Sequence, residues 1–205
     1  MLQQRRIGLT GGIATGKSRV GQLLAEAGLP VLDADVYARE ALAAGSAAAR
    51  AVLARHGESV REKRPDKAGG ADGLDRAALG RIVFADAAER AWLEQLVHPL
   101  VRARFEAELQ RLAAEPTVVL MIPLLFEAGL EALCSEVWLV DCDDSQQLQR
   151  LMARDALSEA DARARIAAQW PLARKRPLAD RLIDNRGPAE ALAVQVAAAL
   201  AGANA

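Results

Sequence analysis

The chain has 205 residues, of which 52% are hydrophobic and 26% charged, a composition typical of a globular enzyme with one substantial core. The formal net charge of −1 at pH 7 gives no broad electrostatic attraction to nucleic acid or to an anionic membrane. The two cysteines, Cys134 and Cys142, are too few for a disulfide scaffold and form no metal-binding CxxC pattern, so we expect reduced thiols in a cytoplasmic protein.

Five short runs that are apolar on both faces predict strands buried in a parallel sheet. These runs are residues 6–10, 30–33, 117–122, 136–140 and 181–183. Helical patterns lie between them, and the first, residues 17–27, ends at a Gly-Leu-Pro stop signal. The alternation of strand and helix predicts an α/β fold with a five-stranded parallel sheet flanked by helices.

The gap between the second and third strands, residues 36–115, is too long for a single crossover. It contains four helical stretches and no convincing strand, so we expect a helical insertion with its own subdomain. One stretch begins near Asp75, and another, residues 87–112, contains Pro99, which should kink or restart the helix. The polar, glycine-rich residues 61–73 predict a mobile loop.

Three further helices are predicted after the third strand. Residues 145–154 carry an amphipathic pattern, and Ser158 begins a capping-box pattern for a helix toward Gln169. Pro188 fits the first position of a last helix over residues 190–201. Neither this alanine-rich segment nor the N-terminal run has the length and character of a membrane span or a signal peptide, so we expect no membrane association.

Residues 11–18 read Gly-Gly-Ile-Ala-Thr-Gly-Lys-Ser and match the phosphate-binding pattern G-x-x-x-x-G-K-[ST] between a strand and a helix. Glycines allow successive backbone N–H groups to point at phosphates, and the start of the following helix adds its positive end. The Lys17 ammonium should reach the β- and γ-phosphates, and the Ser18 hydroxyl should ligate Mg²⁺. We expect ATP contacts from Gly12, Ile13, Ala14, Thr15, Gly16, Lys17, Ser18 and Arg19.

Two acids, Asp33 and Asp35, lie at the end of the second strand. The carboxyl ends of parallel strands open on one crevice, so these side chains should face the phosphate loop. One carboxylate could help to hold Mg²⁺ while the other accepts the proton of an attacking hydroxyl. A helix cap is the alternative for one of the two acids, but it does not explain both.

Arg150 and Arg154 lie four residues apart and therefore share a helix face after the fourth strand. A lid at this place could bring positive charge to the transferred phosphate. Surface placement is the alternative for arginines at this spacing.

Six segments in this order resemble the dephospho-CoA kinase family over residues 7–199. They are Leu9-Thr10-Gly11-Gly12-Ile13, Asp33-Ala34-Asp35-Val36-Tyr37-Ala38-Arg39, Leu74-Asp75-Arg76, His98-Pro99-Leu100, Pro123-Leu124-Leu125-Phe126-Glu127 and Ile183-Asp184-Asn185-Arg186-Gly187. The resemblance implies phosphorylation of the ribose 3′-hydroxyl of dephospho-CoA by ATP with Mg²⁺, and a fold of the nucleoside-monophosphate-kinase type. It further implies a nucleotide-binding core (residues 1–35, 115–142 and 178–205), a helical acceptor subdomain (36–114) and a lid (143–177).

The resemblance also implies a role for individual residues. Asp35 would be the base toward the 3′-hydroxyl, Asp33 would lie near Mg²⁺, and Arg154 would act from the lid beside Lys17 as a catalytic cation. The acceptor site would be lined by Asp35, Arg39, His98, Pro123, Leu124, Leu125 and Glu127. Asn185 and Gly187 would lie by the adenine of ATP. No nucleic acid, membrane or obligate protein partner is implied.

Three features depart from the usual family pattern. The family usually has glycine at the position of Ala14 and threonine at that of Arg19, and the stretch 61–73 is longer and more charged than expected. Ala14 keeps its N–H but narrows the allowed backbone angles, and Arg19 replaces a hydroxyl that could contact the α-phosphate with a cation that could pair with it. Both changes bear on nucleotide affinity rather than on the reaction.

Other readings of the phosphate loop remain to be compared. A GTPase would need an N-K-x-D motif, which the chain lacks, and a transport or motor ATPase would need partner features beyond the Walker B-like residues 137–141. Another small-metabolite kinase, acting on shikimate or a nucleoside monophosphate, would share the fold and chemistry. A non-catalytic nucleotide-binding module would bind nucleotide without turnover, whereas the combination of Lys17, Ser18, Asp33 and Asp35 favours an enzyme.

Overall fold

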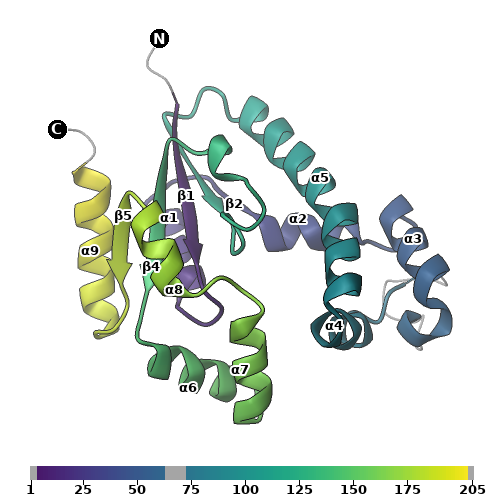
Figure 1. Ribbon diagram of the computed structural model, residues 1–205. Coiled ribbons are helices and arrows are strands. Elements are labelled where there is room, and N and C mark those ends of the chain that lie inside the picture. The colour runs from purple at the N-terminus through teal and green to yellow at the C-terminus, as the bar shows by residue number, and fades with distance from the viewer. Residues whose placement is uncertain (1–3, 63–72, 203–205) are drawn as a thin grey trace. The chain divides into compact units, whose positions relative to one another are not determined.

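The computed structural model describes residues 4–62 and 73–202, and its centre is a five-stranded sheet with the order β2-β3-β1-β4-β5 (Figure 1). The strands are β1 (Arg5–Gly11), β2 (Val31–Asp33), β3 (Thr117–Met121), β4 (Glu136–Asp141) and β5 (Arg181–Asp184). All four pairings are parallel. The five predicted strands are therefore confirmed, each within one residue at either end.

The apolar alternation of the strands explains which helices cover each face of the sheet. Ile7, Leu9 and Trp138 point to the same face, where they form one core cluster with α1 (Lys17–Glu26) and α9 (Ala189–Ala201). Leu139 points to the other face and packs against Leu172 of the short helix α8 (Leu172–Lys175). β5 forms one edge of the sheet, and its residue Leu182 is about half exposed, unlike the fully buried strands that we predicted.

A pair of helices, α6 (Asp144–Asp155) and α7 (Glu159–Ala167), follows β4. The two helices pack against each other (Figure 1). Ser158 caps α7 as predicted, because its hydroxyl accepts a hydrogen bond from the Asp161 N–H at 3.1 Å. Pro188 is the N-cap of α9 and stands just before the helix, so the prediction that it is the first helical residue is wrong by one position.

The chain divides into two compact units, and Ala34–Ala107 form the second of them. This unit contains α2 (Ala34–Ala41), α3 (Ala47–His56), the 3₁₀ turn η1 (Gly57–Val60), α4 (Arg76–Ala85) and most of α5 (Ala87–Arg111). Its own core joins Val52, Val60, Leu74 and Leu79. Among its described residues the only β pairing is an isolated bridge between Arg61 and Leu74, so the predicted helical insertion is present.

Two expectations for the insertion have different outcomes. α5 is one continuous helix with Pro99 inside it, so the helix does not restart at the proline. Most of the glycine-rich stretch 61–73 lies outside the described residues. Within residues 4–62 and 73–202, no helix combines the length and the hydropathy that crossing a membrane requires.

Candidate active site

The phosphate loop joins β1 to α1 and has the geometry that its glycines predict. Gly16 has φ +100°, and a Cβ at this position would lie 2.1 Å from Asn185 Nδ2, so no larger residue fits. The Thr15 hydroxyl donates to the Gly12 carbonyl at 2.9 Å and closes the turn. Lys17 is only 9% exposed, whereas Ser18 is exposed.

Ala14 has φ +60°, in the left-handed region that favours glycine. The departure from the usual family residue therefore falls at a position where an alanine side chain is strained. This geometry sharpens the expectation drawn from the sequence, because the substitution affects the backbone shape of the loop itself.

Asn185 contacts the phosphate loop directly. Its side-chain amide donates to the Thr15 backbone carbonyl at 2.8 Å, and the backbone carbonyl of Asn185 accepts a hydrogen bond from Arg150 Nη2 at 2.9 Å. The loop that contains Asn185 and Gly187 is thus fixed to the phosphate loop on one side and to α6 on the other. Of the two arginines on the shared helix face, Arg150 is the one that joins this cluster.

Asp141, the last residue of β4, is bound by two arginines. Arg176 donates two hydrogen bonds to it at 3.0 Å each, and Arg186 donates a third at 2.7 Å. The side chain of Asp141 is buried, and its hydrogen bonds raise the pKa of Arg176. The Walker B-like pattern at 137–141 therefore ends in a structural ion-pair network that fixes the segments before and after β5.

Arg154 lies on the exposed side of the α6–α7 pair, where it binds Asp155 at 2.7 Å. Arg165 of α7 binds the same carboxylate at 3.0 Å. The hydrogen bond from Arg154 lowers the pKa of Asp155, and the burial of the carboxyl opposes this only in part. The Arg165–Asp155 pair therefore joins α7 to α6, while Arg154 in this conformation is bound within α6.

The segment 123–127 is held in place by a buried lysine. Lys175, which is fully buried, binds Glu127 Oε1 at 2.8 Å and lies 3.4 Å from the Pro123 carbonyl oxygen. Pro123 also accepts a hydrogen bond from the Thr10 hydroxyl at 3.2 Å, and the backbone N–H of Trp170 donates to Glu127 at 3.0 Å. Both ends of the segment are therefore bound to residues beside the phosphate loop or after α7, while Leu125 is fully buried in the core and Leu124 half-buried.

The remaining predicted residues follow β2 in the chain. Asp33 is half-buried at the carboxyl end of β2, and Asp35 is exposed in the first turn of α2. In the second unit, Arg39 is exposed on α2 and its carbonyl accepts a hydrogen bond from Arg76 at 2.9 Å. His98 is half-buried on α5.

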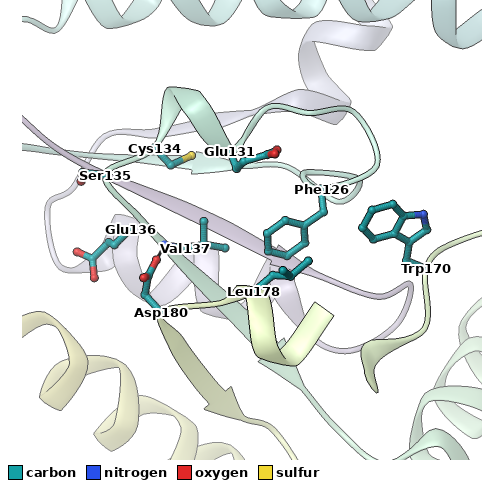
Figure 2. A pocket seen from close by; sticks show the side chains of 9 residues that line it. All are labelled: Phe126, Glu131, Cys134, Ser135, Glu136, Val137, Trp170, Leu178 and Asp180. Atoms are coloured by element: carbon teal, nitrogen blue, oxygen red, sulfur yellow. Dashed lines mark hydrogen bonds between the residues drawn. The ribbon is translucent and has the colours of Figure 1, made fainter. Parts of the chain in front are cut away.

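A pocket of about 350 Å³ opens elsewhere on the first unit (Figure 2). Figure 2 shows Phe126 and Trp170 at one end and the carboxylates of Glu136 and Asp180 at the other. Both carboxylates are already bound, Glu136 by Arg5 and Trp138, and Asp180 by the Val137 N–H at 2.7 Å. The pocket lies at the amino-terminal end of β4, whereas the phosphate loop lies at the carboxyl ends of the strands, so it is separate from the phosphate site.

Sequence reasoning missed three residues that contact the phosphate loop or the segment 123–127: Lys175, Gln147 and Gln169. Lys175 had one signal, because lysine is rare in this arginine-rich chain and the two other lysines besides Lys17 lie in the polar stretch 61–73. The two glutamines had none, since glutamine on a helix is most often solvated.

A parallel sheet with this phosphate loop between its first strand and first helix defines a P-loop nucleotide-binding protein. The family model for dephospho-CoA kinase matches residues 5–190. Dephospho-CoA kinase of Synechococcus sp. (strain CC9605) is 65% identical over 184 residues, covering 90% of this chain and 86% of the relative. The chain belongs to the dephospho-CoA kinase family.

Two solved structures extend this similarity to three dimensions. TT1252 from Thermus thermophilus has a TM-score of 0.78 at 38% identity and covers 98% of both chains. Dephospho-CoA kinase from Campylobacter jejuni has a TM-score of 0.70 at 26% identity, again over 98% of both chains. The predicted fold class and the family resemblance are thereby confirmed.

Proposed function

We propose that the protein transfers the γ-phosphate of ATP to the ribose 3′-hydroxyl of dephospho-CoA, giving ADP and coenzyme A. The observation that carries this proposal is the family match over residues 5–190, which includes the phosphate loop, both acids after β2 and the segment 123–127. Shikimate and nucleoside-monophosphate kinases share the P-loop chemistry, but they are not the family to which this chain belongs.

On this proposal the first unit binds ATP. The loop residues from Gly12 to Arg19 and the Lys17 ammonium bind the phosphates, and Lys17 also stabilises the charge of the transferred group. Asn185 and Gly187 lie by the adenine, a role supported by the hydrogen bond from Asn185 to Thr15. Residues 143–177 form the lid, from which Arg154 supplies charge once it leaves Asp155.

The acceptor is bound by the second unit together with the segment 123–127. Asp35 is the base that accepts the proton of the 3′-hydroxyl, which is supported by its exposure just beyond the carboxyl end of β2. Arg39 and His98 contribute to the acceptor site from α2 and α5. In the first unit, four residues shape the acceptor site: Pro123, Leu124, Leu125 and Glu127. Leu125 is buried and acts by fixing the backbone of the segment.

Mg²⁺ is the metal that this chemistry requires, and the donor set fits it. The Ser18 hydroxyl and the Asp33 carboxylate are hard oxygen donors, the kind that Mg²⁺ prefers. Such a site takes one or two protein ligands besides phosphate oxygens and water. When bound, the ion neutralises charge on the β- and γ-phosphates.

We further propose that the enzyme works in the cytoplasm on free ATP and dephospho-CoA, without nucleic acid, membrane or an obligate protein partner. The near-zero net charge and the small number of cysteines support this placement.

The test is the formation of coenzyme A from ATP and dephospho-CoA by the purified protein, with and without Mg²⁺. Asp35→Asn should lower kcat by roughly 10²-fold or more while ATP still binds, because the general base is lost. Asp144→Asn, an exposed acid on α6, is the matched control and should leave kcat unchanged. Rapid phosphorylation of shikimate or a nucleoside monophosphate without coenzyme A formation would refute the proposed acceptor, and an unchanged kcat in Asp35→Asn would remove Asp35 from its role.

A further inference from the structure

Both backbone polar groups of Ile13, a residue of the phosphate loop, are bound by side-chain amides. The Ile13 N–H donates to Gln169 Oε1 at 2.8 Å, and Gln147 Nε2 donates to the Ile13 carbonyl at 2.8 Å. The chemistry fixes the orientation of both amides, because an N–H needs an acceptor and a carbonyl needs a donor. Gln147 is only 4% exposed, so its hydrogen bond is protected from water.

The glycine at position 12 is fitted to one of these amides. A Cβ on Gly12 would lie 2.5 Å from Gln147 Nε2. The absence of a side chain here serves the contact with Gln147 as much as the approach of a phosphate. The backbone of the loop at Gly12 therefore lies directly against the side-chain amide of Gln147 on α6.

One glutamine lies on α6 and the other just after α7, so each belongs to a different part of the α6–α7 pair. Gln147 lies on α6, close to its start, and Gln169 follows the end of α7. A displacement of the α6–α7 pair relative to the sheet would stretch both hydrogen bonds at the same time. The next residue, Ala14, has the strained φ of +60°, a conformation that persists only when its surroundings impose it.

We propose that Gln147 and Gln169 are positioning residues of the nucleotide site. Together they fix the two peptide groups that flank the Ile13 Cα, so that Ala14 keeps its left-handed conformation and the loop stays shaped for the phosphates. They also couple the position of the α6–α7 pair to the shape of the loop, and by reciprocity ATP in the loop stabilises the position of the pair. This proposal needs only an ATP-binding loop and does not depend on the identity of the acceptor.

The experiment compares Gln147→Ala, Gln169→Ala and the double variant with Gln149→Ala, an exposed glutamine on the same helix. Each single change should raise the KM for ATP by about tenfold, the effect of one protected hydrogen bond, and leave the KM for dephospho-CoA unchanged. The double variant should lose less than the product of the two single losses, because both glutamines fix the backbone of the same residue, Ile13. Gln149→Ala should behave as the wild type.

A second readout follows the Ile13 N–H group itself. Exchange of the Ile13 amide hydrogen, measured by NMR, should be slow in the wild type and fast in Gln169→Ala. Gln169→Glu should restore slow exchange, since a carboxylate still accepts from the N–H, whereas Gln147→Glu should not replace the lost donor to the carbonyl. Gln169 is only half-buried and is the position that decides the outcome if the change at Gln147 lowers stability.

Three results would overturn the proposal: an unchanged KM for ATP in Gln169→Ala, equal changes in the KM of both substrates, or a double variant equal to the product of the singles.

Discussion

Among residues 4–62 and 73–202, two alanines have the left-handed backbone conformation. Ala14 in the phosphate loop has φ +60°, and Ala156 at the C-cap of α6 has φ +51°. For a residue with a Cβ this conformation costs about 1–2 kcal/mol, and only glycine adopts it without strain. Helix C-caps with this conformation usually carry glycine for the same reason.

Ala14→Gly and Ala156→Gly should therefore each raise the free energy of unfolding, by up to about 1 kcal/mol. The gain is smaller than the strain, because glycine also increases the entropy of the unfolded chain. Urea denaturation measures both variants, and Ala156→Gly is the matched control outside the nucleotide site. Destabilisation by Ala14→Gly alone would mean that the methyl group of Ala14 makes a favourable contact that outweighs the strain.

At the level of residues, the sequence predicted the phosphate loop but not its supports. The pattern at 11–18 is local, and its glycines and lysine carry their meaning in the sequence itself. The contacts of Gln147 and Gln169 with Ile13 join residues more than a hundred positions apart, and no local pattern distinguishes these glutamines from solvated ones. The φ of Ala14 could be expected only from comparison with the glycine that is usual in the family.

Among the elements, the segment from Gln169 to the end of α8 contacts the phosphate loop and the segment 123–127 at once. Gln169 binds Ile13, the backbone of Trp170 binds Glu127, and the buried ammonium of Lys175 binds Glu127 from the other end of the segment. The short segment from Gln169 to Lys175 thus holds both the phosphate loop and the segment 123–127 in place.

Removing the charge of Lys175 leaves Glu127 partly buried without its partner. Lys175→Met should lower the free energy of unfolding by about 3 kcal/mol, and the added change Glu127→Gln should recover most of this loss. Lys175→Met should also raise the KM for dephospho-CoA if the segment 123–127 binds the acceptor. Denaturation curves and acceptor kinetics measure the two effects separately.

The control for this pair is Arg163→Met, which breaks the exposed Arg163–Glu159 pair on α7. Pairs of this kind contribute little, so its stability should change by less than about 0.5 kcal/mol. Equal losses in Lys175→Met and Arg163→Met would contradict the role given to the buried pair.

Element types were easier to predict from the sequence than element ends. The strands were found because they are apolar on both faces, a signal that burial in a parallel sheet requires. Helix starts depend on which of several polar residues caps the first turn. Accordingly α2 starts at Ala34, directly after Asp33 and with Asp35 inside its first turn, and Pro188 stands just before α9 as its N-cap. Pro99 within α5 was expected to interrupt a helix that tolerates it.

On the scale of the whole molecule, both cysteines are unreactive by placement. Burial raises the pKa of the Cys134 thiol to about 12, and burial also raises that of Cys142, which is fully covered. The thiolate is the reactive form, so a raised pKa means that fewer thiols are ionised at any pH below it.

Native protein treated with iodoacetamide at pH 8 should therefore label Cys134 on the order of 10³-fold more slowly than unfolded protein, and Cys142 slowly as well. Mass spectrometry of protein quenched at intervals, with and without urea, measures both rates. Rapid labelling of either cysteine in the native state would show that the sheet around it opens far more often than a folded core should.

The helical unit Ala34–Ala107 occupies the connection between β2 and β3, two strands that pair directly in the register Val31↔Val119. None of the strand pairings of the sheet involves this unit. The unit is thus an insertion in the crossover from β2 to β3, and its residues can change without altering a strand pairing. On the function proposed above, acceptor recognition can therefore be altered within this unit while the sheet and the phosphate loop keep their residues.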